Sequence, residues 1–178
     1  MLARELIVVT GPPRSGKTTF ITRLIERLRS LGESFAGMIT VEVRESGERR
    51  GFDVMDVSTG VSAPLARKGG GSGPRVGSYL VYIDNLERVG VSAIEAHLQD
   101  KTVLFIDEVG PMEVLSSRFV DAVKRSVYSK ERLIITRHYH MRHELVTLID
   151  SRATLTVDLM RRPSISLDGV VERLIGPR

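Results

Sequence analysis

Residues 6–18, LIVVTGPPRSGKT, join an apolar run to a glycine-rich loop. The run from Leu6 to Val9 is aliphatic and mostly β-branched, which is typical of a buried parallel strand. From Gly11 to Thr18 the chain matches G-x-x-x-x-G-K-[ST], the pattern of a phosphate-binding loop. A strand, this loop and a following helix together predict an α/β fold.

Each fixed position of the loop has a physical role. Gly11 and Gly16 permit backbone conformations that turn successive N–H groups toward phosphate oxygens. Lys17 supplies a charge for the β- and γ-phosphates, and Thr18 supplies a hydroxyl for Mg²⁺. The helix that starts there favours an anion at its N-terminus. We predict that nucleotide phosphates bind Gly11, Pro12, Pro13, Arg14, Ser15, Gly16, Lys17, Thr18 and Thr19.

The composition is that of a globular protein. The chain has 178 residues, 42% hydrophobic and 27% charged, which favours one domain spanning residues 1–178. It has no cysteine, which excludes disulfides, a thiol nucleophile and a cysteine zinc site. Apolar runs are short, and the N-terminus leads directly into the first strand. We therefore expect no membrane span, no signal peptide and a cytoplasmic location.

The net charge of +4 raises nucleic acid as a partner. The basic residues are scattered, however, and aromatic residues are only 5% of the chain, with no basic–aromatic interleaving for base stacking. A protein that handles polyphosphates can carry this charge without nucleic acid. Nucleoside triphosphates are therefore the expected partners, and the oligomeric state is open.

Hydrophobic periodicity predicts the other elements. Strands 35–43 and 51–57 flank a polar turn at Gly47 and should form an antiparallel hairpin, which extends a largely parallel sheet. Ser92 and Glu95 have capping-box spacing, which predicts a helix beginning at Ser92. The remaining expected helices are 18–31, 117–128, 143–150 and 168–175, and the remaining strands are 79–83, 102–106, 132–136 and 153–158.

The glycine-rich stretch 66–78, with Arg67, Lys68 and Arg75, has two interpretations. It could be a mobile lid over phosphates or a solvated linker.

A second buried strand ends in two acids, which is the Walker B pattern. Because ligands of open α/β sheets bind at the carboxyl edge of the strands, these acids should face the loop. Asp107 would hold Mg²⁺ opposite Thr18, and Glu108 would orient or deprotonate an attacking water. The predicted segment consists of Val103, Leu104, Phe105, Ile106, Asp107, Glu108, Val109 and Gly110.

Arginines supply further catalytic candidates. Arg137 follows strand 132–136, where an arginine could stabilise charge in the transition state; a surface arginine is the alternative. Arg75, Arg161 and Arg162 are weaker candidates of the same kind.

Two other features have no single interpretation. His138, His140 and His143 lie within six residues of one another, but lack neighbouring carboxylates or cysteines at zinc spacing, which favours surface imidazoles over a metal site. Glu113 could support the magnesium site or cap helix 117–128.

Several motifs together resemble a family of small nucleoside-triphosphatases of thermophile type. The most diagnostic is the continuation of the Walker B strand into Gly110-Pro111-Met112-Glu113. The others are the loop Gly11–Thr19, Gly37-Met38-Ile39-Thr40 with Glu42 and Arg44, Arg50-Gly51-Phe52-Asp53-Val54, and Arg75-Val76-Gly77 with Tyr79. The chain departs from this family at Arg14, where a small residue is common, and at Met160-Arg161, where an Asn-Arg pair is common.

The resemblance implies a RecA-like P-loop fold with three layers. It also implies Mg²⁺-dependent hydrolysis of nucleoside triphosphates to the diphosphate and phosphate, with loose base preference. The chain has no Asn-Lys-x-Asp motif for reading guanine, which agrees with base tolerance. Two rival functions stay open: a nucleotide or nucleoside kinase, and an ATP-gated module that binds RNA or protein.

Overall fold

Nine strands pair into one mixed sheet in the computed structural model, which describes residues 4–161 and 165–176. Their order across the sheet is β5-β6-β4-β3-β2-β7-β8-β1-β9. The strands are β1 (Glu5–Thr10), β2 (Phe35–Glu45), β3 (Glu48–Asp56), β4 (Ser62–Lys68), β5 (Arg75–Val76), β6 (Tyr79–Val81), β7 (Val103–Val109), β8 (Arg132–Arg137) and β9 (Leu155–Asp158).

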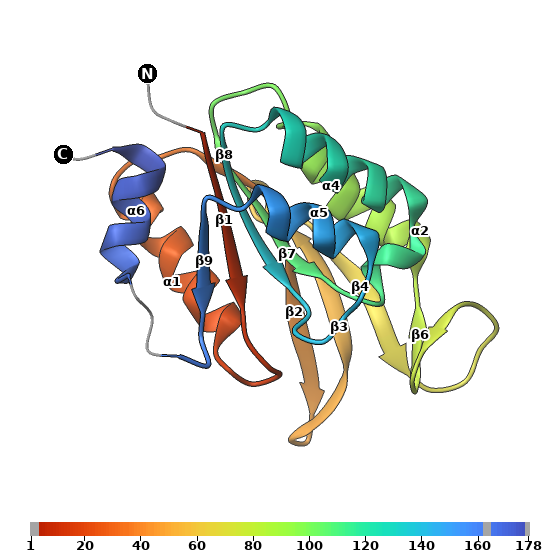
Figure 1. Cartoon of the computed structure of the whole chain (residues 1–178). Coiled ribbons are helices and arrows are strands. Elements are labelled where there is room, and N and C mark those ends of the chain that lie inside the picture. The colour runs from red at the N-terminus through yellow and green to blue at the C-terminus, as the bar shows by residue number, and fades with distance from the viewer. Residues whose placement is uncertain (1–3, 162–164, 177–178) are drawn as a thin grey trace.

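Helices cover both faces of the sheet, so the fold has three layers (Figure 1). One face carries α1 and α6, and the other carries α2 to α5. The helices are α1 (Lys17–Ser30), α2 (Ile83–Asn85), the π-helix η1 (Leu86–Val91), α3 (Ser92–Glu95), the 3₁₀ helix η2 (Glu113–Leu115), α4 (Ser117–Ser129), α5 (Glu144–Arg152) and α6 (Leu167–Ile175). Among the described residues, no helix is long and apolar enough to cross a bilayer.

The parallel half of the sheet contains β2, β7, β8, β1 and β9, so their carboxyl ends meet at one edge. All six residues of β1 are buried, as expected for a strand with helices on both faces. On α1, the residues buried against the sheet recur at helical spacing and form an apolar stripe that consists of Ile21, Leu24, Ile25 and Leu28. The α/β fold predicted from these two elements is confirmed.

The predicted hairpin is confirmed as the antiparallel pair β2–β3, in which Val41 lies opposite Asp53. Figure 1 shows the hairpin extending past the carboxyl ends of the parallel strands. The antiparallel half continues through β4 and β6 to β5.

The start of the glycine-rich stretch 66–78 belongs to the sheet. The sequence analysis missed β4, which pairs with β3 and holds Arg67 against Asp53. Beyond β4, Arg75 donates hydrogen bonds to the carbonyls of Gly69 and Gly71, at 2.8 and 3.3 Å. Arg75, at the end of the loop between β4 and β5, is thus hydrogen-bonded to backbone carbonyls near the start of that loop.

The predicted helix at Ser92 is confirmed as α3, but the predicted capping box does not form, because α3 is the last part of a longer helical segment. Helical structure starts at Ile83, and the Ser92 hydroxyl donates to the carbonyl of Glu87 instead of capping a helix. The turns before Ser92 contain Gly90, and glycine has a low helix propensity. The sequence pattern therefore did not indicate that the helical segment starts before Ser92. Gly90 is required by packing, because a Cβ there would lie 2.8 Å from both Met38 Sδ and Val54 Cγ2.

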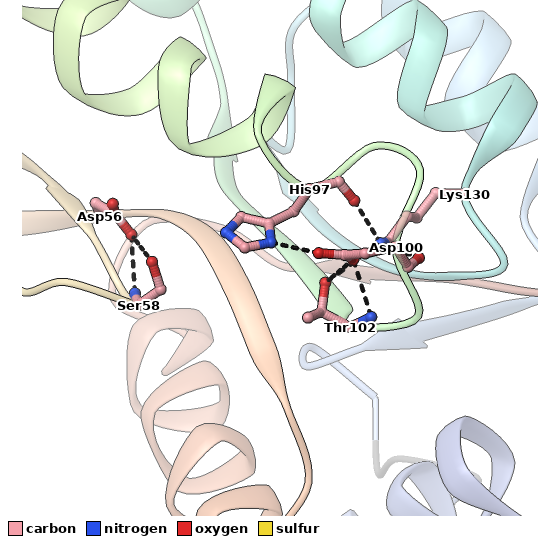
Figure 2. Close-up of polar contacts among 6 residues, drawn as sticks. All are labelled: Asp56, Ser58, His97, Asp100, Thr102 and Lys130. Carbon is pink, nitrogen blue, oxygen red and sulfur yellow. Dashed lines mark hydrogen bonds and ion pairs between the residues drawn. The ribbon is translucent and has the colours of Figure 1, made fainter.

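A buried lysine joins the end of α4 to the loop before β7 (Figure 2). The Lys130 side chain is 1% exposed, and its Nζ donates to the carbonyls of His97 and Asp100 and to Asp100 Oδ1, at 2.5, 2.9 and 2.7 Å. Burial disfavours ionised Asp100, but hydrogen bonds from Lys130, Thr102 and His97 outweigh it and hold its pKa well below the usual range. The cluster therefore ties two distant segments together.

Replacing Lys130→Met should lower the free energy of unfolding by about 2 kcal/mol at pH 7, because carbonyls and a carboxylate lose their donor. An ionised group with a lowered pKa stabilises the fold above its unfolded pKa, about 4, and this contribution is lost as the pH falls further. The difference between wild type and variant should therefore shrink below about pH 4. Urea denaturation measures both effects. Lys124→Met, on an exposed ion pair of the same helix, is the control; equal stability of the two variants would contradict this role of Lys130.

Candidate active site

The phosphate-binding loop connects β1 to α1. Ser15 N donates to the Pro12 carbonyl at 3.1 Å, and the Lys17 ammonium donates to the carbonyls of Gly11 and Pro12 at 2.9 and 3.4 Å. The ammonium therefore lies against the loop itself. The buried hydroxyls of Thr10 and Ser15 have no hydrogen-bond partner among the described residues, which is expected where a polar ligand binds.

Arg14 is the unusual residue of the loop. Its φ of 67° is in the left-handed region, which costs a residue with a Cβ about 1–2 kcal/mol. The side chain is exposed and lines the cleft in front of the loop. Arg14 thus adds a cationic residue to the lining of the cleft.

Asp107 is held between two neighbouring strands. Its Oδ1 accepts from the Thr136 hydroxyl of β8, and its Oδ2 accepts from Thr40 N of β2 at 3.4 Å. The Thr40 hydroxyl donates to the Asp107 carbonyl at 2.9 Å. Burial, and to a lesser extent the charge of Glu108, raises the pKa of Asp107 to about 6 in spite of the Thr136 hydrogen bond.

Glu108 lies next to Asp107 where the pairing of β7 and β8 shifts register, between Ile106 and Val109. A register shift of this kind re-aims side chains at the end of a strand. Burial raises the pKa of Glu108, and the charge of Lys17 opposes that rise. No described residue hydrogen-bonds its carboxylate, so the group is free to accept a proton.

Glu113 is a third carboxyl in the cleft, with only 3% of its surface exposed. Burial, together with the charges of Glu108 and Asp107, raises its pKa to about 8. It does not cap α4, because the Ser116 hydroxyl accepts from Phe119 N at 3.0 Å and does so instead. A Cβ on Gly110 would lie 3.0 Å from Glu113 Oε2 and 3.2 Å from Glu108 Cγ, so the two acids flank this glycine.

The residues after β8 that line the cleft differ from the one predicted from the sequence. Arg137 points to α5, where its Nε donates to Asp150 Oδ1 at 2.8 Å, and it does not line the cleft. His138 and Tyr139 line it instead. Burial lowers the pKa of His138, and the charges of Lys17 and His140 add to this effect.

The other two histidines, His140 and His143, do not line the cleft. His143 caps α5 by accepting from Leu145 N at 3.1 Å, and His140 stacks edge-on against Tyr139. Of the weaker arginine candidates, Arg161 is 89% exposed beside Asp158, and Arg162 lies outside the described residues.

These groups face one cleft of about 780 Å³. Residues 13–19 of the loop line it together with Asp107, Glu108 and Gly110, while Val103 to Ile106 are core residues behind it. The hairpin supplies the remaining wall. Sequence reasoning missed the role of Thr136 and the position of His138, since both depend on how β8 meets β7.

A phosphate-binding loop after β1 and acids at the end of β7, with β8 between these strands, define a P-loop nucleoside-triphosphatase. Comparison with known proteins agrees. A family model described as NTPase matches residues 6–167. Nucleoside-triphosphatase THEP1 of Thermofilum pendens is 44% identical over 137 residues, covering 77% of this chain and 75% of the relative. THEP1 of Methanopyrus kandleri is 39% identical over 173 residues, covering 95% and 94%.

Two solved structures have the same fold. THEP1 of the hyperthermophile Aquifex aeolicus superimposes with a TM-score of 0.76 at 28% identity, covering 86% of this chain and 89% of that one. A human cancer-related nucleoside triphosphatase superimposes with a TM-score of 0.73 at 30% identity, covering 95% and 93%. The chain belongs to the THEP1 nucleoside-triphosphatase family, which confirms the resemblance in its motifs and makes it a nucleotide-binding hydrolase.

Burial of Asp107 should cost stability in the ligand-free protein. Because its pKa is raised, ionisation destabilises the fold as the pH rises from about 4 to about 6, and the cost is complete above that range. Asp107→Asn should therefore raise the free energy of unfolding by about 3 kcal/mol at pH 7.5 and by less than about 1 kcal/mol at pH 4.

Denaturant titrations at the two pH values, without nucleotide or metal, measure this difference. Asp121→Asn, an exposed change on α4, is the control and should have no effect at either pH. A variant that is less stable than the wild type at pH 7.5 would show that the Thr136 and Thr40 hydrogen bonds outweigh burial.

Proposed function

We propose that this protein hydrolyses nucleoside 5′-triphosphates to the diphosphate and phosphate, with broad tolerance of the base. One observation carries the proposal: the phosphate-binding loop and the pair Asp107–Glu108 line the same cleft. Binding of a polyphosphate and activation of water are therefore available at one place. Since a single sheet carries the loop, the acids and the hairpin, we also propose that the chain acts as one domain.

The loop would hold the triphosphate. Backbone N–H groups at the start of α1 favour the anion, and Lys17 can move its hydrogen bonds from the loop carbonyls to the β- and γ-phosphates. Arg14 adds a second cation in the cleft. These contacts involve phosphates only, which supports base tolerance.

The donor set fits Mg²⁺. This ion prefers hard oxygen ligands and retains several waters, so one carboxylate and one hydroxyl from the protein suffice. Thr18 and Asp107 both line the cleft and would hold it there. When bound, Mg²⁺ would neutralise charge that develops on the β- and γ-phosphate oxygens. Burial raises the pKa of Asp107, so its ionised form would gain from a cation bound beside it.

Glu108 would act on the water. Its carboxylate has no hydrogen-bonding side chain among the described residues, and its raised pKa makes it a stronger base than an exposed glutamate. It would orient the water and accept its proton as the oxygen attacks the γ-phosphorus. Arg137 has no part in this mechanism, since its guanidinium is engaged by Asp150.

Glu108→Gln should lower the rate of phosphate release by about 10²–10⁴-fold while nucleotide binding persists, because the amide cannot accept the proton. Phosphate release and equilibrium binding of ATP, GTP, CTP and UTP measure both properties. Wild-type kcat/KM should vary by no more than about tenfold among the four bases, which is the difference that about 1.4 kcal/mol produces. Glu144→Gln, exposed on α5, is the control. Turnover by Glu108→Gln within twofold of the control would remove Glu108 from the mechanism.

A further inference from the structure

The imidazole of His138 enters the cleft just after the end of β8. Side chains alternate between the two faces of a strand, and here Thr136 contacts Asp107 while Arg137 points to α5. His138 therefore returns to the side of Thr136, and it lines the cleft. Its backbone N donates to the Val109 carbonyl at 3.0 Å, which extends the contact between β8 and β7 by one residue. The backbone thus fixes the ring next to the end of the acidic strand.

We propose that Nε2 of His138 donates a hydrogen bond to the γ-phosphate of the bound nucleoside triphosphate, which makes His138 a further catalytic residue of the hydrolysis. The inference rests on the proposed function, because a triphosphate must first occupy the phosphate-binding loop. His138 would thus take the role that the sequence analysis gave to Arg137.

The hydrogen bonding of the ring determines which nitrogen of His138 can donate. His140 N donates to Nδ1 of His138 at 3.4 Å, so Nδ1 carries the lone pair. In a neutral imidazole the other nitrogen, Nε2, then carries the proton. Burial lowers the pKa of His138, and the charges of Lys17 and His140 add to this effect, so the ring is neutral at pH 7.5. No described residue accepts a hydrogen bond from Nε2, which leaves its N–H for a ligand in the cleft.

The charge of Lys17 relates the ring to the position of the phosphate. This ammonium affects the pKa values of Asp107, Glu108 and His138, so all three side chains lie near it. In the proposed function, Lys17 binds the γ-phosphate and Glu108 directs a water to it. A γ-phosphate beside Lys17 therefore lies in the part of the cleft that His138 faces.

The contact would act on the transition state as well as on binding. Negative charge spreads over the oxygens of the γ-phosphoryl group as the bond to the leaving oxygen breaks. A donor that is already held near those oxygens stabilises this charge without having to reorganise. The backbone after β8 and the hydrogen bond from His140 N hold the ring of His138 before any triphosphate binds.

The test compares two amides that carry their donor at different places. Glutamine places its amide nitrogen near the position of Nε2, whereas asparagine, which is one methylene shorter, reaches only the position of Nδ1. The full-length protein and its His138→Gln and His138→Asn variants are titrated with the β,γ-imido analogue of ATP and with ADP, both with Mg²⁺ at pH 7.5. Phosphate release from ATP is measured in parallel.

For the wild type we expect tighter binding of the analogue than of ADP. In His138→Asn this preference should fall about tenfold or more, because only the analogue has a γ-phosphate, and kcat for ATP should fall by at least the same factor. His138→Gln should keep both values within about threefold of the wild type. His140→Ala is the matched control: it removes the neighbouring ring, retains the backbone N–H that holds His138, and should change neither value.

The outcomes that would overturn the inference differ from those that would overturn the proposed function. An unchanged preference in His138→Asn, or the same loss of preference in His138→Gln, would show that no donor at Nε2 contacts the γ-phosphate. Equal losses of affinity for the analogue and for ADP would assign His138 to another part of the nucleotide, which also overturns it. Absence of phosphate release from ATP by the wild type would overturn the proposed hydrolysis, while the two affinities would still decide whether His138 contacts the γ-phosphate.

Discussion

The site depends on the burial of one carboxylate, Asp107, between two threonines from neighbouring strands. Thr136 and Thr40 can reach it because β8 and β2 flank β7 in a parallel arrangement, which brings the ends of all three strands to one edge. The cost of the arrangement appears in the raised pKa of Asp107. A neutral side chain at this position would avoid the cost of burying a charge. A carboxylate there is therefore explained by function, such as binding a cation.

The other two acids of the cleft, Glu108 and Glu113, also have raised pKa values. Burial raises the pKa values of Asp107, Glu108 and Glu113 together, and their mutual repulsion adds to the effect on Asp107 and Glu113. Lys17 favours ionisation of both Asp107 and Glu108. The charge of Lys17 does not offset burial in the ligand-free site, so a divalent cation that enters with the triphosphate would favour the ionised form of these acids.

The sequence predicted those parts of the fold that depend on local pattern. The buried run before Gly11, the apolar stripe of α1 and the alternation in the hairpin each determine their own element. The start of the helical segment before Ser92 could not be predicted, because Gly90 is selected by packing against Met38 and Val54 and not by helix propensity. The strand β4 was missed because its small residues and its proline give no alternation of apolar and polar side chains.

The site, like the fold, could be predicted only in part from the sequence. The loop and the acids follow from motifs, so their common cleft could be expected from the rule that ligands bind at the carboxyl edge of parallel strands. The residue after β8 could not, because the register shift between Ile106 and Val109 decides which side chain faces the cleft, and it directs Arg137 to Asp150. Likewise, the contact between Thr136 and Asp107 joins positions 29 residues apart.

The most direct test of water attack on the γ-phosphorus is hydrolysis of ATP in water enriched with ¹⁸O. If Glu108 directs a water to the γ-phosphorus, each released phosphate carries one solvent oxygen and the ADP carries none. Solvent oxygen in the ADP, or release of AMP and pyrophosphate, would contradict the assignment of the loop and the acids to the γ-phosphate.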